Sequence, residues 1–197
     1  MRRDVLRMTA ETALTFNVLE KGRFHIRQYG HLVAQSLKNG QKHNWVGPFL
    51  ASNYWRMNGN AVEAIVCLRK AIYSAPIQYK HLGLLSLANV FHRSHNGQDA
   101  LATLDLASKY SPDNPAILFT MGNVYATLMQ FNESAKSYSE ALRMQPQFAA
   151  ARERRHAVVC HAKLEQVSFF LYMTDFAVFK KPLPGLGGTA QAIGSHS

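Results

Sequence analysis

The chain has 197 residues, of which 47% are hydrophobic, so it can bury a core and is not globally disordered. Its net charge is +10, and the excess of Lys and Arg over acids lies in residues 1–44 (eight against three) and 149–197 (six against three), whereas residues 45–148 are nearly balanced (eight against six). No run reaches the roughly 20 apolar residues that a membrane-spanning helix needs, and two cysteines cannot make a disulfide framework. We therefore expect a protein of a reducing compartment, the cytoplasm.

The N-terminal segment, residues 1–44, is basic and is predicted to be partly helical. Apolar side chains recur at helical spacing in its second half, which predicts a helix over residues 24–38 at the N-terminal end of the next element. The spaced residues are Ile26, Tyr29, Leu32, Val33 and Leu37.

Residues 45–148 contain three copies of one pattern, in 45–78, 81–114 and 115–148. Six positions of the second copy recur 34 residues later in the third, and the same internal spacing is found in the first. The matched sets are Ser52, Trp55, Ala64, Leu68, Ala71 and Pro76; Ala88, Phe91, Ala100, Leu104, Ala107 and Pro112; and Gly122, Tyr125, Ser134, Tyr138, Ala141 and Pro146. A period of 34 residues is that of the tetratricopeptide helical hairpin. The prediction is an all-α solenoid of three such hairpins.

The chemistry of these positions explains why they repeat. A small residue in each first helix (Ser52, Ala88, Gly122) lets the second helix of the hairpin approach closely, and the aromatic residue three positions later fills the space beside that contact. Small and large apolar residues alternate along the buried stripe of each second helix. A proline ends each second helix because it has no N–H to extend it.

The pattern predicts six helices in the hairpins and a seventh that closes the array. The predicted ranges are 47–58, 61–74, 81–94, 98–110, 115–128, 131–144 and 149–166. Helix 149–166 is expected to act as a cap, because Ala157, Val158 and Leu164 give it an apolar face and its other face is charged. Residues 167–197 are apolar at first and then low in complexity, and we expect this tail to be disordered.

Several runs resemble one family of large tetratricopeptide repeat proteins in particular. They are Asn58–Ala61, Ala64–Ala71, Leu85–Arg93, Gly122–Ala126, Arg155–Cys160 and Lys163–Gln166. The resemblance covers residues 44–166 and stops at Gln166, where the family would continue as a charged helix, so the chain is similar to a partial or truncated member. The resemblance implies a protein-interaction scaffold in actin cytoskeleton organisation and cilium assembly, located in the cytoplasm in association with the cytoskeleton.

The candidate site is a ladder of asparagines. Asn53, Asn89 and Asn123 each follow the small residue of a first helix, so all three are expected on the inner, concave surface of the array. An Asn amide offers both a donor and an acceptor, and it can bind the backbone of an extended peptide whatever the peptide's side chains. The alternative is that asparagine is merely common at this position of the repeat.

Charged and apolar residues of the first helices extend this candidate peptide-binding site. Arg56, His92 and Arg93 lie one turn further on and favour acidic segments of a partner protein, through charge-assisted hydrogen bonds; the alternative is that they are solvated charges. Three apolar residues stand where a carboxylate clamp would need a basic side chain, and we expect them to form hydrophobic pockets instead. They are Phe49, Leu85 and Phe119.

No pattern predicts a metal, a cofactor or catalysis. His156, Cys160 and His161 supply too few ligands, because a zinc site needs four, or three and a water. The glycines of residues 185–188 lie in the low-complexity tail, without the strand and helix that flank a phosphate-binding loop. We therefore expect a non-enzymatic protein.

Nucleic-acid binding is the alternative from another functional class. The basic flanks could contact phosphates, and Phe24, Tyr29 and Trp45 could stack on bases. Aromatic residues at helical spacing are more often part of a core, and the repeats are nearly neutral. A steep fall of affinity with salt would favour this alternative over peptide binding.

Overall fold

The computed structural model describes residues 8–11, 25–39 and 45–179, and every regular element in these ranges is a helix. The elements are α2 (Ile26–Asn39), α3 (Val46–Met57), α4 (Ala61–Ser74), the 3₁₀ helix η2 (Ile77–Tyr79), α5 (Lys80–Arg93), α6 (Gly97–Tyr110), α7 (Pro115–Thr127), α8 (Phe131–Met144) and α9 (Ala149–Phe179). The chain divides into two compact units, Met1–Val159 and Cys160–Ser197.

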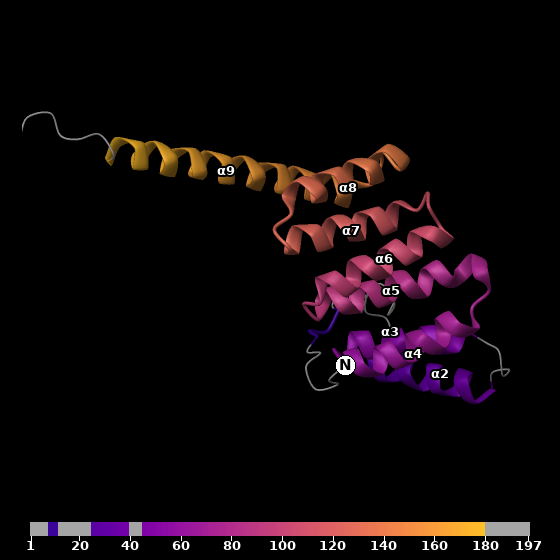
Figure 1. Cartoon of the computed structure of the whole chain (residues 1–197). Coiled ribbons are helices and arrows are strands. Elements are labelled where there is room, and N and C mark those ends of the chain that lie inside the picture. Colours follow the sequence, from indigo (N-terminus) through magenta and orange to yellow (C-terminus); the bar gives the residue numbers. More distant parts are fainter. Residues whose placement is uncertain (1–7, 12–24, 40–44, 180–197) are drawn as a thin grey trace, which may run out of the picture. The chain divides into compact units, whose positions relative to one another are not determined.

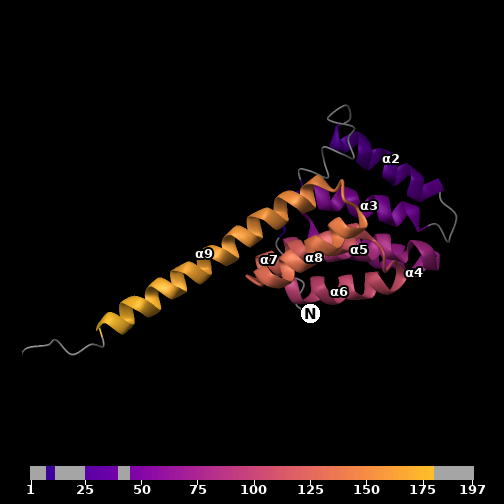
Figure 2. The ribbon, with the colours of Figure 1, turned by 90° about the horizontal axis from the view of Figure 1, so that it is seen from above.

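Helices α3 to α8 form three hairpins that stack in chain order, α3 with α4, α5 with α6 and α7 with α8 (Figure 1). Seen from above, the hairpins lie over one another, and α2 lies beside α3 (Figure 2). The predicted all-α solenoid of three hairpins is confirmed. The six hairpin helices begin and end within one residue of the predicted ranges, and the predicted helix 24–38 corresponds to α2.

The small residues of the repeat are buried where the two helices of each hairpin meet. Ser52 and Ala88 of the first helices are fully buried, and so are the matched large residues of the second helices, Leu68, Leu104 and Tyr138. Close packing of this kind leaves no room for added methylene groups. The repeat pattern in the sequence therefore follows from the contacts between the two helices of each hairpin.

The turn inside each hairpin has the same backbone conformation in all three copies. Residues 59, 95 and 129 have positive φ angles of 73°, 58° and 61°, but only the first is a glycine; the others are His95 and Met129. In each turn the next residue donates its N–H to a carbonyl five residues back, at 2.9 Å. This is the Schellman ending, in which a left-handed residue terminates the helix.

Helix α9 closes the third hairpin through its first turns. Ala151 and Val158 are buried with Tyr138 and Ala141 of α8. The predicted apolar face was wrong in part, because Ala157 and Leu164 are both exposed and neither belongs to the core cluster of Ala151 and Val158. The reason is the seven-residue spacing of Ala151 and Val158, which brings these two residues to one side of the helix.

The end of α9 also differs from the prediction. The helix continues beyond residue 166 to Phe179, so residues 167–179 of the tail expected to be disordered are helical. These residues contain neither glycine nor proline, and nothing in them breaks a helix before Pro182. Residues 180–197 lie outside the described residues. Within the described ranges, no helix is long and apolar enough to cross a membrane.

Candidate functional site

A short non-helical segment of the chain, Met8–Glu11, lies against the ends of α3 and α5. The Met8 side chain is buried in a cluster with Ala61, Ala64, Leu68 and Val90. The backbone passes so close to the turn at Gly59 that a Cβ there would lie 2.9 Å from the Met8 carbonyl oxygen and 3.2 Å from the Ala10 nitrogen. A side chain larger than that of glycine at residue 59 would therefore obstruct the segment.

Glu11 is held by Arg56 of α3 through three hydrogen bonds. Arg56 Nε and Nη2 donate to the two carboxylate oxygens of Glu11, each at 2.8 Å, and the Glu11 N–H donates to the Arg56 carbonyl at 3.2 Å. The two side chains are only 7% and 11% exposed. Bidentate charge-assisted pairs of this kind are strong and geometrically specific. This contact joins residues that are 45 positions apart in the chain.

Arg56 also connects the first two hairpins. Its Nη1 donates to Ser86 Oγ of α5 at 3.1 Å and, at 3.5 Å, approaches Asn53 Oδ1. Arg93, at the end of α5, binds the same segment. Its Nη2 lies 3.3 Å from the Thr9 carbonyl, 3.0 Å from Thr9 Oγ1 and 3.1 Å from the Ala10 carbonyl. Arg93 thus binds two carbonyl oxygens and the Thr9 hydroxyl, whereas Arg56 binds a carboxylate.

We call this arrangement of Arg56, Gly59, Ala61 and Arg93 the first seat. It contains two of the three basic residues that the sequence singled out. Sequence reasoning missed Met8 and Glu11 as their partners. Neither residue belongs to a periodic pattern, and an isolated acid 45 residues from Arg56 gives no signal in a single sequence.

The three asparagines of the predicted ladder differ in their surroundings. Asn53 is buried, and the Tyr29 hydroxyl of α2 is hydrogen-bonded to it. Burial raises the pKa of Tyr29, and the bond to Asn53 opposes that rise. Asn123 Oδ1 accepts a hydrogen bond from the Tyr138 hydroxyl at 2.8 Å. Asn89 is half-buried, and among the described residues its side chain has no hydrogen-bond partner. Asn89 is therefore the ladder residue most available to a ligand.

The three apolar candidates, Phe49, Leu85 and Phe119, are half-buried and pack against core clusters. Phe49 lies edge-on to Trp45, with ring centroids 5.9 Å apart. Phe119 lies 4.8 Å from the Phe148 ring and 5.7 Å from the Tyr138 ring, measured between centroids. These side chains contribute to the stacking of the hairpins, and their role in ligand pockets stays a prediction.

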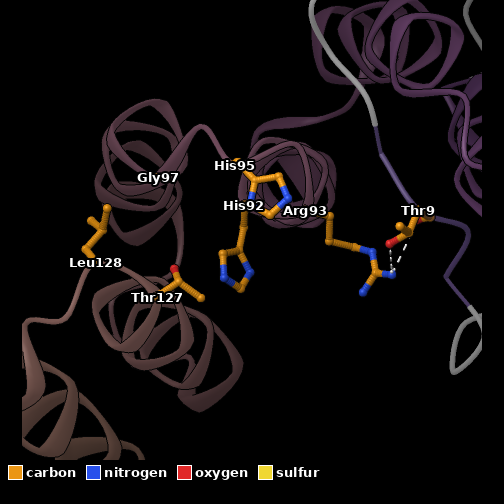
Figure 3. Close-up of a pocket in the computed structure, with 7 residues that line it drawn as sticks. All are labelled: Thr9, His92, Arg93, His95, Gly97, Thr127 and Leu128. Atoms are coloured by element: carbon orange, nitrogen blue, oxygen red, sulfur yellow. Dashed lines mark hydrogen bonds between the residues drawn. The ribbon is translucent and has the colours of Figure 1, made fainter.

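Beside the first seat, a pocket of about 490 Å³ opens between the second and third hairpins. Its lining residues are Thr9, His92, Arg93, His95, Gly97, Thr127 and Leu128. Figure 3 shows the Arg93 side chain reaching toward Thr9, while the His92 ring lies between Arg93 and Thr127. Burial lowers the pKa of His92, and the charges of Arg93, His95 and Arg154 lower it further. Because Arg93 lines the pocket and none of the described lining residues is acidic, the pocket is electropositive.

The aromatic residues proposed to stack on bases are engaged within the fold where the structure describes them. The Tyr29 hydroxyl donates to the Leu50 carbonyl at 3.1 Å, and Trp45 stacks on Tyr79 with centroids 5.4 Å apart. Phe24 lies outside the described residues. In the described ranges no three His, Cys, Asp or Glu side chains are grouped as metal ligands would be.

Comparisons with known proteins place the chain beside one set of relatives. It is 38% identical over 141 residues to tetratricopeptide repeat protein 17 of Danio rerio, and 33% identical over 169 residues to the proteins of the same name from Rattus norvegicus and Homo sapiens. These matches cover 72% to 83% of the chain but only 12% to 15% of each relative. The chain thus corresponds to a small part of these longer proteins. No family model matches it.

The fold has a counterpart among solved structures. The crystal structure of MamA superposes with a TM-score of 0.57, covering 88% of this chain and 98% of MamA at 14% sequence identity. An identity this low supports the shared arrangement of helical hairpins and carries no information about ligands.

Proposed function

Because the chain belongs to the tetratricopeptide repeat family, we propose that it is a non-enzymatic scaffold that binds extended segments of partner proteins on the face formed by the first helices of its hairpins. The observation that supports the proposal is the segment Met8–Glu11, which lies against the ends of α3 and α5. A surface that binds one non-helical segment through a carboxylate and backbone carbonyls has the chemistry to bind another.

The preferred partner segment is acidic. Arg56 and Arg93 supply charge-assisted donors at the first seat, and the imidazole groups of His92 and His95 add hydrogen-bonding groups toward the third hairpin. Opposite charges steer a partner to the surface and set its register. Asn89 adds a donor and an acceptor for the partner's backbone.

The cellular role rests on the relatives. We propose that the chain acts in the cytoplasm, in association with the cytoskeleton, and that its partners are regulators of actin organisation and cilium assembly. The resemblance to tetratricopeptide repeat protein 17 supports this role, although the chain spans about one eighth of those relatives' length.

The test is affinity capture from a lysate of ciliated cells with quantitative mass spectrometry. Four tagged chains are compared: wild type, Glu11→Ala, Glu11→Ala with Arg56→Gln and Arg93→Gln, and Glu11→Ala with Arg69→Gln and Lys70→Gln. The last pair removes the same charge from exposed positions of α4. Circular dichroism confirms that all four chains are folded.

The proposal expects partners that are enriched by Glu11→Ala, lost with the Arg56 and Arg93 substitutions, and kept with the α4 control. Actin or cilium regulators among them would support the cellular role. If the chain with the Arg56 and Arg93 substitutions captures the same proteins as the α4 control chain, the first-helix face does not bind partners. Adding Asn89→Ala to the Glu11→Ala chain tests the asparagine ladder, because loss of the same partners would show that Asn89 helps to bind them.

A further inference from the structure

The pocket between the second and third hairpins is the first seat moved along the chain by one repeat. Moving from the first hairpin to the second adds 36 residues, and moving from the second to the third adds 34. The residues Arg56, Gly59, Ala61 and Arg93 of the first seat thereby correspond to His92, His95, Gly97 and Thr127, and all four of the latter line the pocket. The same backbone turn lies in both places, with positive φ at Gly59 and at His95.

From this equivalence we propose that the pocket is a second seat, which binds an extended acidic segment of a partner protein. The inference rests on the proposed function and specifies where on the array, and by which residues, a partner is bound. In the first seat the site is filled by the chain's own Met8–Glu11, whereas the second seat is open and borders it at Thr9 and Arg93 (Figure 3). A partner segment would therefore lie next to the chain's own segment along the array.

The Arg93 charge and the imidazole groups of the second seat favour an acidic side chain. His92 stands where Arg56 binds the Glu11 carboxylate, and His95 and Arg93 flank it. None of the described residues that line the pocket is acidic, and the groups that act on His92 are all basic, namely Arg93, His95 and Arg154. Arg93 Nε is buried without a hydrogen-bond partner among the described residues, so it is a donor that a carboxylate could satisfy.

The second seat differs from the first in one respect that shapes its ligand. Gly59 lets the backbone of Met8–Ala10 approach within van der Waals distance, whereas His95 carries a side chain at the equivalent position. A segment in the second seat must therefore pass farther from the turn. It is held by its acidic side chain, with less contribution from backbone contact than in the first seat.

The test uses a fluorescein-labelled synthetic peptide with the sequence of residues 6–13, Leu6-Arg7-Met8-Thr9-Ala10-Glu11-Thr12-Ala13, as a surrogate ligand. Fluorescence polarisation measures its binding to the full chain, whose first seat is occupied by its own segment. Thr127→Glu places a negative charge in the second seat. Thr103→Glu is the matched control, because both threonine hydroxyls donate to a carbonyl of the preceding helical turn.

The expected result is that Thr127→Glu, or replacement of the peptide's glutamate by glutamine, weakens binding by about tenfold, the usual size of a lost charge-assisted contact. Thr103→Glu leaves binding unchanged. Combining His92→Arg with His95→Gly copies the first seat and tightens binding. Equal affinities for Thr127→Glu and Thr103→Glu would overturn the second seat.

A second arm separates this inference from the proposed function. In the Glu11→Ala chain the first seat binds the chain's own segment Met8–Glu11 more weakly. The peptide should therefore bind at the first seat, and Arg56→Gln should abolish that binding. Binding at the first seat without any effect of Thr127→Glu would refute the second seat alone. Absence of peptide binding in both chains would refute the proposed function, and the second seat with it.

Discussion

Gly122 of α7 lies directly against the ring of Tyr138 of α8, and a Cβ at residue 122 would come within 2.5 Å of Tyr138 Cε1. The ring is fully buried, and its hydroxyl donates to Asn123 Oδ1 at 2.8 Å, so it cannot swing away without losing that bond. In the second hairpin the same two positions are Ala88 and Leu104. The third hairpin thus accommodates a larger side chain on one helix by having a smaller one on the other.

The effect of Gly122→Ala should change sign with the residue at position 138. In the wild-type chain the clash with Tyr138 should lower the free energy of unfolding by about 1–2 kcal/mol, within the range for overpacking. In the Tyr138→Leu background the clash is relieved and the helix propensity of alanine remains, so Gly122→Ala should stabilise by up to about 1 kcal/mol. Urea denaturation of the four chains in this cycle measures both effects. Additive effects would show that the two residues do not compensate each other.

The array could be predicted from sequence because its contacts are local and repeat. Gly122 and Tyr138 are close in the sequence, and the matched pair of the second hairpin, Ala88 and Leu104, has the same spacing and shares one core cluster. The length of α9 was missed because the apolar composition of residues 167–179 says little about whether a helix continues.

The candidate site was predicted less completely, because its decisive contacts join distant parts of the chain. Arg56 was identified as a basic residue of the first helices, but its partner Glu11 is 45 residues away and belongs to no pattern. Likewise, the spacing that identified Asn123 could not show that Tyr138 binds its amide oxygen. The second seat could not be predicted from sequence, because it depends on which residues contact Met8–Glu11 and on their equivalents one repeat later.

The turn of the third hairpin should be stabilised by a glycine. Met129 has a φ of 61° and is 69% exposed, so its side chain contributes little packing to offset the strain of the left-handed conformation. Met129→Gly should raise the free energy of unfolding by about 1 kcal/mol, as measured by urea denaturation. Met129→Ala is the control, since it shortens the side chain without relieving the backbone. Equal stability of the two variants would contradict this account of the turn.

The two cysteines should differ in reactivity. Burial raises the pKa of the Cys67 thiol, the charge of Glu63 raises it further and that of Lys70 opposes the rise, whereas Cys160 is exposed. Since the thiolate is the reactive form, maleimide should label Cys160 several times faster than Cys67 at pH 7. Mass spectrometry of peptides from a time course measures both rates. Glu63→Gln should speed the labelling of Cys67 without changing Cys160, and a Cys67 rate equal to that of Cys160 would argue against its burial.

Acid should destabilise the array through His92. Burial, followed by the charges of Arg93, His95 and Arg154, holds the pKa of His92 below its ordinary value near 6.5. As pH falls through that value the unfolded chain takes up the proton first, so the free energy of unfolding decreases until the pH is below the pKa of the folded state. His92→Asn should therefore lose less stability than the wild type between pH 7.5 and pH 5. His31→Asn, at an exposed position of α2, controls for histidine removal; identical pH profiles for the three chains would rule out the effect.

Glu11→Gln should release the segment Met8–Glu11 without unfolding the array. The substitution removes the charge from a bidentate contact with two 2.8 Å bonds, worth about 1–3 kcal/mol. The segment is bound at the surface of a fold that is otherwise complete, so the loss should appear as local opening, and global stability should change less. Hydrogen exchange at the Glu11 amide, which is bonded to the Arg56 carbonyl at 3.2 Å, reports the opening directly. We expect that amide to exchange at least tenfold faster, while amides in α4 to α8 keep their rates and Glu133→Gln leaves Glu11 unchanged. Unchanged exchange at Glu11 would mean that Met8 burial and the Arg93 contacts suffice to hold the segment, and that the carboxylate does not decide what binds at the first seat.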